Sequence, residues 1–396
     1  MPPPPASDAC PGLLALHPAR DGHVARIRLP GGYVTGPRWR ALAGLARDFG
    51  DGHLDLTSRG NVQLRGLRPG DAGELARRAA AAGLLPSAAH DRARNIMASP
   101  LAGLDGRPPL RPLVRALDAV LLREAELAAL PGRFLFSLDD GTGGAGLATC
   151  DVGLLRGGHD RELVVAGRLA GVRAGRPRPP GEAVVAAAAR AAIAAGVGHA
   201  VSRIADLPDG GASVAAALGG ALGAPAAGPD SRLPLGPARV AEAAGPGPGN
   251  PERSSVTMVA GARLGRLTVS QAELVADLLR PGEVIRLGLA GRIVIPLAAR
   301  LTGARTRLAE AGLLVAGDDP MAGVTACSGM ACHRSVADVR AAAGPLPGHA
   351  RTHWAGCARQ CGLPPDAEPV IAVDADRYLI PGEVRPRLLA TLAGAP

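Results

Sequence analysis

Four of the six cysteines in this chain of 396 residues lie between positions 327 and 361. Four residues separate Cys327 from Cys332, twenty-four residues follow, and three residues separate Cys357 from Cys361. Thiolates that are paired at short spacing across a longer loop can surround a zinc ion or an iron–sulfur cluster. Zinc knuckles more often use gaps of two residues, so these wider gaps favour a cluster, with zinc as the alternative.

Arginine supplies all of the basic charge, because the sequence contains no lysine. The formal net charge is +9 at pH 7. A planar guanidinium binds a carboxylate at two points and stays charged. The arginines are scattered and aromatic residues make up only 2% of the chain, which argues against a nucleic-acid partner. An acidic small molecule fits this charge better.

No stretch has the pattern of a membrane span or a secretory signal. The N-terminal sequence MPPPPASDACPG lacks the apolar core of a signal peptide. The longest uncharged stretch, 210–229, is rich in Gly, Ala and Pro and too weakly hydrophobic to cross a bilayer. We therefore expect a cytoplasmic protein with no membrane partner, in which clustered cysteines bind metal rather than form disulfides.

A unit of similar sequence occurs twice. The first copy reads LPGGYVTGPRWRALAGLARDFGDGHLDLTSRGNVQLRGL, and the second reads ARLGRLTVSQAELVADLLRPGEVIRLGLAGRIVIPL. Each pattern predicts a short apolar step that ends in Thr, then an amphipathic helix, then two strands that meet at a glycine. Ser270 and Glu273 have the spacing of a capping box, which predicts the start of the second helix.

The two copies share their apolar positions but not their polar ones. A duplicated scaffold that keeps polar groups in one copy suggests that this copy provides the working surface. A second interpretation, compatible with the first, is that the other copy packs against something apolar. The polar positions are Thr57, Ser58, Arg59, Asn61, Gln63 and Arg65, and their counterparts are Gly288, Leu289, Ala290, Arg292, Val294 and Pro296.

Each copy is followed by a longer stretch of strand and helix patterns, and a segment rich in Gly, Pro, Ala and Ser separates the two halves. We predict an α+β fold with an internal duplication, in which each of two half domains is followed by an α/β body. The predicted segments are 1–85 for the tail and first half domain, 86–205 for the first body, 206–255 for the linker, 256–315 for the second half domain and 316–396 for the second body.

These stretches resemble a known superfamily. LDLTSRGNVQLRGL looks like the signature of the ferredoxin-like half domain of nitrite and sulfite reductases, and the duplication and paired cysteines match their architecture and [4Fe-4S] motif. Within the superfamily the chain most resembles the precorrin-3B synthases, over most of its length outside 206–255. The stretches are ACPGLLALHPARDGHVARIRLPGG, GDGHLDLTSRGNVQLRGL, RNIMASPLAG, LPGRFLFSLDDG, AGVTACSG and HWAGCARQCG.

The resemblance implies a monooxygenase of aerobic cobalamin biosynthesis. Such an enzyme hydroxylates precorrin-3A, a polycarboxylate tetrapyrrole, at C20 and closes a γ-lactone from the ring A acetate. It uses dioxygen and an electron donor, NADH or a reduced redox protein, and its implied cofactors are a [4Fe-4S] cluster and a non-haem iron. One alternative is a siroheme-dependent nitrite or sulfite reductase. Another is a non-enzymatic binding protein that is stapled by zinc or carries a cluster.

The resemblance also assigns residues, although it names no catalytic residue and no ligand of a separate iron. The implied cluster ligands are Cys327, Cys332, Cys357 and Cys361. The implied tetrapyrrole-binding residues are Arg59, Asn61, Arg65, Arg94 and Arg133.

Two features depart from the reductase pattern. Leu135 stands where the reductases have a second basic residue, which argues against reduction of a small anion. The gap between Cys327 and Cys332 is one residue shorter than usual in the family, so the loop that carries Cys332 must adjust. Asp139 and Asp140 have two interpretations: a turn, which Asp-Asp-Gly often forms, or carboxylates that face pyrrole N–H groups or an iron.

Overall fold

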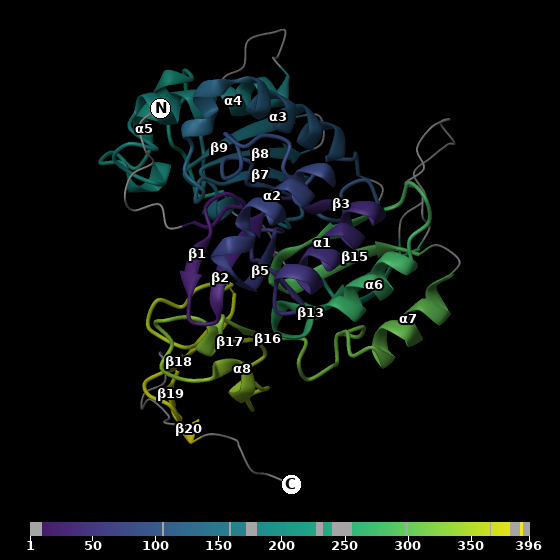
Figure 1. The fold of residues 1–396 in the computed structure, drawn as a ribbon. Coiled ribbons are helices and arrows are strands. Elements are labelled where there is room, and N and C mark those ends of the chain that lie inside the picture. The colour runs from purple at the N-terminus through teal and green to yellow at the C-terminus, as the bar shows by residue number, and fades with distance from the viewer. Residues whose placement is uncertain are drawn as a thin grey trace.

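The chain folds into four five-stranded sheets with helices packed on them, in the part of the chain that the structure describes (Figure 1). This confirms the predicted α+β class with internal duplication. The computed structural model describes residues 10–104, 107–157, 160–171, 180–226, 233–239, 256–297, 300–364, 366–380 and 389–390.

The two half-units exchange a strand. Each half-unit forms an antiparallel sheet whose last strand comes from the other half-unit: β13 pairs with β4, and β3 pairs with β14. The first sheet has the order β1 (His17–Ala19), β2 (Gly22–Ile27), β5 (Val62–Leu67), β4 (His53–Leu56), β13 (Arg266–Thr268). The second has the order β11 (Gly236–Arg239), β12 (Val256–Gly261), β15 (Arg292–Pro296), β14 (Val284–Leu287), β3 (Tyr33–Thr35).

A glycine with positive φ precedes each exchanged strand. Gly32 has φ 71°, and a Cβ atom there would lie 2.4 Å from the carbonyl oxygen of Leu287 in the other half-unit. Gly265 has φ 73° and lies against the carbonyl of Leu56 in the same way, with 3.4 Å to its Cβ position. L-residues rarely adopt this backbone conformation. The two glycines therefore let each chain segment cross closely onto the opposite sheet.

Helices α1 (Gly36–Phe49) and α6 (Val269–Asp277) follow the exchanged strands and pack side by side over the two sheets (Figure 1). Trp39 of α1 is fully buried and donates its indole N–H to the carbonyl of Ala272 in α6, at 2.9 Å. One hydrophobic core contains buried side chains from both half-units. Helices α2 (Ala72–Ala81) and α7 (Leu301–Glu310) complete this layer.

The start of the second helix differs from the prediction. Thr268, not Ser270, is the N-cap of α6, and its hydroxyl forms a capping box with Gln271. The predicted pair of Ser270 and Glu273 was therefore two residues too late. Glu273 instead pairs with Arg47 of α1, which its place on the exposed side of α6 allows.

The repeat extends to the two bodies. Each body has a sheet of three parallel strands followed by two antiparallel ones. The first sheet comprises β6 (Ile96–Ala98), β7 (Phe136–Asp139), β8 (Val152–Gly157), β9 (Asp160–Val165) and β10 (Arg168–Leu169). The second comprises β16 (Val324–Ala326), β17 (Thr352–Ala355), β18 (Glu368–Ala372), β19 (Arg377–Leu379) and β20 (Leu389–Ala390).

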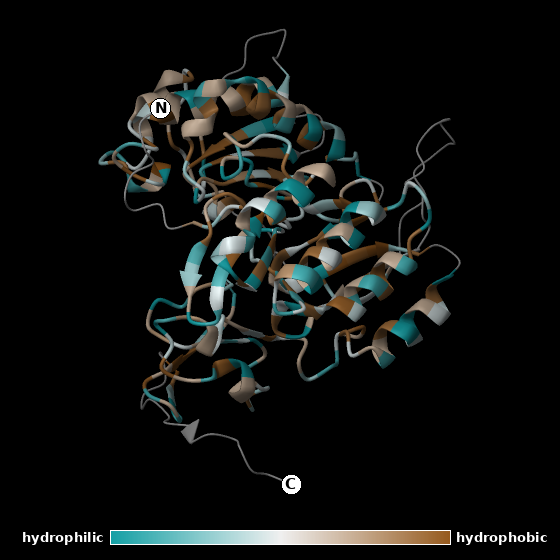
Figure 2. Cartoon of the chain, viewed as in Figure 1, coloured by the Kyte–Doolittle hydropathy of each residue, from teal (hydrophilic) through white to brown (hydrophobic). Residues whose placement is uncertain are grey.

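The bodies differ in their helices. The first is covered by α3 (Arg111–Arg123) and α4 (Gly181–Ala194), and its strands β7 and β8 are strongly hydrophobic (Figure 2). The second has only the short α8 (Val339–Ala342) among its described residues, so its loops reach the centre of the molecule. No helix in the described ranges is long and apolar enough to span a membrane.

The segment 206–255, predicted to be a linker, is only partly a loop. Its Ala-rich part forms α5 (Ala212–Ala217), which buries Val214 and Ala215 in the core of the first body. Its strand β11 is the edge strand beside β12. Ala favours helix, and the open edge of β12 offers backbone partners, so composition alone misjudged these two parts. The stretches 227–232 and 240–255 lie outside the described residues.

The contact between Trp39 and Ala272 can be tested directly. Trp39→Phe should lower the free energy of unfolding by about 1–2 kcal/mol, because a buried hydrogen bond and part of the packing are lost. Native-state hydrogen exchange should become faster in both β3 and β13. Trp354→Phe, in the core of the second body, is the matched control and should leave exchange in β3 and β13 unchanged. Faster exchange in only one of these two strands would contradict the exchanged arrangement.

Candidate functional site

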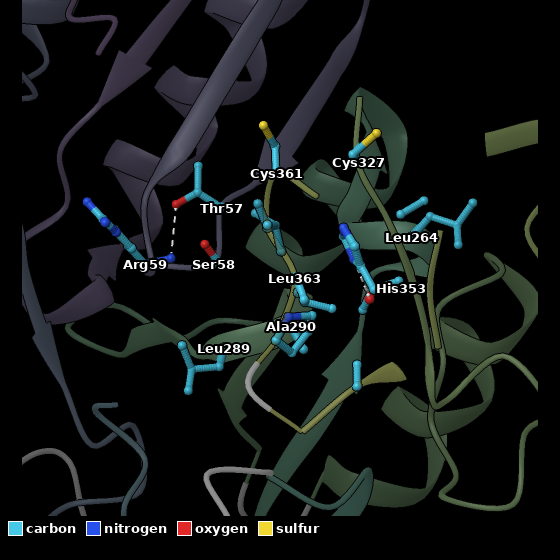
Figure 3. Close-up of a pocket in the computed structure, with 18 of the residues that line it drawn as sticks. Thr57, Ser58, Arg59, Leu264, Leu289, Ala290, Cys327, His353, Cys361 and Leu363 are labelled. Atoms are coloured by element: carbon cyan, nitrogen blue, oxygen red, sulfur yellow. Dashed lines mark hydrogen bonds between the residues drawn. The ribbon is translucent and has the colours of Figure 1, made fainter. Parts of the chain in front are cut away.

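A cavity of about 480 Å³ lies where the two half-units and both bodies meet (Figure 3). Residues from four distant parts of the sequence line it. The turn between β4 and β5 contributes Thr57, Ser58 and Arg59; the first body contributes Met97, Leu135, Gly146 and Thr149; the second half-unit contributes Leu264, Leu289, Ala290 and Arg292; and the second body contributes Cys327, His353, Cys361 and Leu363.

Equivalent turns of the two half-units both reach the cavity. The turn at 57–60 is polar, whereas its counterpart at 288–291 presents Leu289 and Ala290. Both turns keep a glycine with positive φ, 64° at Gly60 and 70° at Gly291. The first turn therefore presents polar side chains to the cavity and the second presents apolar ones, although Arg292 follows the second turn directly. This arrangement fits both interpretations of the unequal repeat: that the polar copy provides the working surface, and that the other copy packs against something apolar.

Arginine dominates the charge of the lining, which contains five arginines and two aspartates. Arg351 donates to Asp366 at 2.7 Å, and Arg340 lies 3.7 Å from Asp55. The other three arginines have no carboxylate partner among the described residues. They donate to neutral oxygens: Arg26 to Gln63 Oε1 at 2.9 Å, Arg59 to the Arg133 carbonyl at 3.0 Å and Arg292 to the Ala322 carbonyl at 2.7 Å.

Burial makes these unpaired charges costly. Burial, with repulsion from Arg203, lowers the pKa of Arg59 to about 10, and burial lowers the pKa of Arg292 to about 10. Arg28 lies behind Arg26 and is only 3% exposed; burial, with repulsion from Arg26, lowers its pKa to about 9. Guanidinium groups stay protonated in proteins. The shifts therefore measure the cost of holding positive charges that a bound anion would relieve.

The structure places only part of the predicted tetrapyrrole-binding set at the cavity. Arg59 lines it, and its guanidinium points away from the two sulfurs drawn in Figure 3. The side chain of Arg133 is exposed and does not line the cavity, although its carbonyl receives the bond from Arg59. The described contact of this motif with the site is therefore a backbone one, and a binding role for the Arg133 side chain stays a prediction.

Three predicted residues have other partners, and none of them lines the cavity. Asn61 is 1% exposed; its amide oxygen accepts from the Leu29 N–H at 2.9 Å, and its amide nitrogen donates to Asn95 at 2.8 Å. Arg94 forms a two-point ion pair with Asp118 of α3, at 2.6 and 2.8 Å. Arg65 binds Asp21 at two points. In this structure their hydrogen-bonding groups hold the scaffold, and their role in ligand binding stays a prediction.

Sequence reasoning missed Arg26, Arg28 and Arg292. The first two alternate in ARIRLPGG, a strand pattern that brings side chains two residues apart to one face. Arg292 stands where the first copy has Asn61, so the comparison of the copies contained this signal. Asp55 was also missed: it lines the cavity, and its carboxylate lies 3.3 Å from Arg266 and 3.7 Å from Arg340.

The first cysteine pair is shaped by one turn of 3₁₀ helix, η9 (Gly329–Ala331). The N–H of Cys332 donates to the Gly329 carbonyl at 2.9 Å, and Gly329 has φ 57°. Backbone N–H groups of Gly329 and Gly356 donate to Cys327 Sγ at 3.4 and 3.2 Å. The tight turn is how the loop accommodates its gap of four residues.

The four thiols gather in one region. Burial raises the pKa of the Cys361 thiol; Arg359 opposes this shift, and the Cys357, Cys327 and Cys332 thiols add to it. All six cysteines of the chain are free thiols. No three His, Cys, Asp or Glu side chains of the described residues lie close enough to hold a single metal ion.

The donor set fits an iron–sulfur cluster better than zinc. In a [4Fe-4S] cluster each thiolate binds a different iron, so the four sulfurs surround a volume. In a zinc site they converge to about 2.3 Å from one point. The backbone N–H groups that donate to Cys327 Sγ suit a cluster ligand, because hydrogen bonds to the sulfurs tune the cluster.

A histidine also faces the cavity. His353 on β17 is 1% exposed, and its Nδ1 lies 2.9 Å from Thr325 Oγ1. Burial lowers its pKa to about 4, so the ring is neutral at pH 7. The Nε2 atom is buried, and the backbone of Cys361 lies beside the ring.

The sequence allowed two interpretations of Asp139, a turn residue or a carboxylate that faces a ligand, and in the structure it is a turn residue. Its carboxylate accepts three backbone N–H groups, from Gly141, Gly143 and Ala145, at 2.8–3.0 Å. Asp140 binds Thr142 through both its backbone N–H and its hydroxyl. Neither aspartate lines the cavity, so both belong to the turn after β7.

Comparisons with known proteins give a consistent result for part of the chain. Residues 17–82 match the nitrite/sulfite reductase ferredoxin-like half domain. Ferredoxin–nitrite reductase of Leptolyngbya laminosa is 37% identical over 119 residues, which cover 28% of this chain and 23% of the relative. Precorrin-3B synthase of Sinorhizobium sp is 33% identical over 152 residues, which cover 37% of this chain and 32% of the relative. The matched regions thus span about a quarter to a third of these relatives.

The fold has a solved counterpart. The NirA protein of Mycobacterium tuberculosis superposes with a TM-score of 0.63 at 20% identity, over 86% of this chain and 69% of that chain. At this identity the likeness concerns the fold. The chain therefore carries a nitrite/sulfite reductase ferredoxin-like half domain at residues 17–82, within a fold like that of the NirA protein.

Proposed function

We propose that this protein is an oxidoreductase that acts on a reduced tetrapyrrole, as a precorrin-3B synthase-like monooxygenase. One observation carries the proposal: a cavity that is lined both by arginines without carboxylate partners and by apolar side chains lies beside four gathered thiols. A flat macrocycle with a rim of carboxylates matches both kinds of lining. The thiols provide for a [4Fe-4S] cluster, and a non-haem iron belongs to the proposal although no ligand for it is assigned.

In the proposed reaction, one oxygen atom of dioxygen enters precorrin-3A at C20 and the other leaves as water. A reductant supplies two electrons and two protons, and the ring A acetate closes the γ-lactone. The iron centres, when bound, supply electron transfer and oxygen activation. The chain's own residues hold the substrate.

The lining provides binding groups of two kinds. Arg26, Arg59 and Arg292 neutralise carboxylates, because forked guanidiniums bind them at two points. Leu289 and Ala290 contact a face of the ring. Because Arg59 and the two apolar side chains come from equivalent turns, they hold the ring between them. Such a fixed orientation is what selective attack at one carbon requires.

A siroheme-dependent nitrite or sulfite reductase is the second candidate, favoured by the similarity to nitrite reductases. Leu135 speaks against it. This side chain is 2% exposed and lines the cavity, at the position where the resemblance led us to expect a second basic residue. An apolar group there lowers the positive charge available to a small anion.

Anaerobic purification followed by a visible spectrum separates the candidates. If the protein is the monooxygenase, we expect the spectrum to show cluster absorption without macrocycle bands. Under dioxygen we also expect it to convert precorrin-3A to a product with one added oxygen. Retained siroheme bands together with reduction of nitrite or sulfite would establish the reductase instead. A colourless protein that contains zinc would refute both enzymes.

The cluster assignment predicts different results for two cysteines. Cys327→Ser should lose iron and acid-labile sulfide, because its Sγ is one of the four gathered thiols. Cys150→Ser should retain both, because Cys150 is buried in the first body, where burial raises its thiol pKa to about 12. Iron and sulfide analysis of the anaerobic proteins measures this. Full retention in the Cys327 variant would remove that residue from the ligand set.

We expect the arginines without carboxylate partners to destabilise the ligand-free protein and to favour the binding of an anion. Arg28→Met should raise the free energy of unfolding of the ligand-free protein by about 1–4 kcal/mol, because it removes a buried charge that repels its neighbours. Arg94→Met, the matched buried arginine, should lower it by about 2–4 kcal/mol, because Asp118 loses its partner. Chemical denaturation with and without uroporphyrin III, an octacarboxylate probe, measures both effects.

Arg59→Met, whose side chain lines the cavity, should lose the stabilisation that the porphyrin gives the wild-type protein, whereas the Arg94 variant should keep it. Destabilisation of the Arg28 and Arg94 variants to a similar degree would show that Arg28 is an ordinary structural arginine. A porphyrin that stabilises the Arg59 variant as well as the wild type would remove Arg59 from the binding surface.

A further inference from the structure

Arg65 connects the first half-unit to the cysteine loop. This residue of β5 is 5% exposed, and its guanidinium binds an aspartate and two residues of the cysteine loop. It binds Asp21 at two points, 2.9 and 3.0 Å, and it donates to the Ala331 carbonyl at 2.9 Å and to Ser328 Oγ at 3.3 Å. Ser328 follows Cys327 directly and Ala331 directly precedes Cys332. One side chain thus holds both ends of the loop between the two cysteines.

Other contacts fix the same loop from neighbouring strands. The backbone N–H of Arg20, in the turn between β1 and β2, donates to the Ala331 carbonyl at 3.1 Å. Arg340 donates to the Cys327 carbonyl at 3.0 Å and lies 3.7 Å from Asp55 of β4. The loop therefore rests on β1–β2 and on both strands of the β4–β5 hairpin.

The β4–β5 hairpin also carries a polar part of the cavity lining at its turn, Thr57–Arg59, which we call the ligand wall. Arg65 stands six positions beyond Arg59 along β5 and reaches the cysteines instead of the cavity. The spacing between the ligand wall and the first two thiols is consequently set by a single rigid hairpin.

We propose that Arg65, paired with Asp21, is a positioning residue that fixes Cys327 and Cys332 in register with the ligand wall and sets the local charge beside the metal group they hold. This inference rests on the proposed function only in that the thiols hold an iron–sulfur cluster. It replaces a role for Arg65 in binding the substrate.

Two properties of the pair can be separated by substitution. Arg65→Lys keeps the charge but loses the planar fork that spans Asp21 and the loop. Arg65→Gln removes the positive charge and leaves the carboxylate of Asp21 without its partner. Asp21→Asn removes the negative charge and leaves the guanidinium of Arg65 without its partner. Arg94→Gln is the matched control, since Arg94 is equally buried in a two-point ion pair whose partner lies on α3.

The experiment uses the anaerobically purified protein with its iron. Two measurements report how firmly the cysteine loop is held: hydrogen exchange of the loop at 327–332, and the iron retained after gel filtration. The midpoint potential of the cluster reports the charge beside it. Both Arg65 variants should show faster exchange in the loop and lose iron, whereas the Arg94 variant should match the wild type in both. The midpoint potential should fall in Arg65→Gln, rise in Asp21→Asn and stay near the wild-type value in Arg65→Lys, because reduction adds negative charge.

The outcomes distinguish the inference from the proposed function. Wild-type loop exchange and iron retention in both Arg65 variants would overturn the inference while leaving a cluster protein intact. Potential shifts of the same sign in Arg65→Gln and Asp21→Asn would overturn its electrostatic part, since a merely structural pair has no reason to give opposite signs. A wild-type protein that binds no iron would refute the proposed function, and the positioning role would fall with it.

Discussion

The exchange of β3 and β13 between the two central sheets is the constraint on which the rest of the structure depends. Neither half-unit completes its sheet alone, because the fifth strand of each comes from the other half. The exchange forces α1 and α6 together into one core and brings the equivalent turns, 57–60 and 288–291, to opposite sides of one cavity. The site is a product of the duplication.

At this cavity the cost of holding arginine charges without carboxylate partners opposes the stabilisation that packing gives the fold. Buried guanidiniums without carboxylate partners raise the free energy of the ligand-free fold, as the lowered pKa values of Arg28, Arg59 and Arg292 indicate. Arg94 and Arg65, which do not line the cavity, are paired with Asp118 and Asp21. Arg59 and Arg292 do line it, so a bound anion would relieve the cost of these two charges.

Local patterns in the sequence were enough to predict the strands, the helix α1, the duplication and the gathered cysteines. They could not predict the exchange, because an apolar alternation identifies a strand but not its partner. They also could not show that Asn61, Arg65 and Arg94 lie outside the lining of the cavity. A polar residue in a motif looks the same whether it faces a ligand or a partner far along the chain, and Arg65 finds one of its partners 266 positions away. Arg59 does line the cavity, because it lies on a turn that reaches it.

The two turns show which features the scaffold demands and which are open to change. Both keep a glycine with positive φ, Gly60 and Gly291, since a Cβ atom there would be strained and would approach backbone of the crossing segment. The three positions before each glycine differ completely, polar in one copy and apolar in the other. Because the exchange fixes where both turns lie, their side chains could diverge without moving the backbone. Divergence of this kind gives an internally symmetric fold an asymmetric cavity, which a ligand with a charged rim and an apolar face can enter in one orientation.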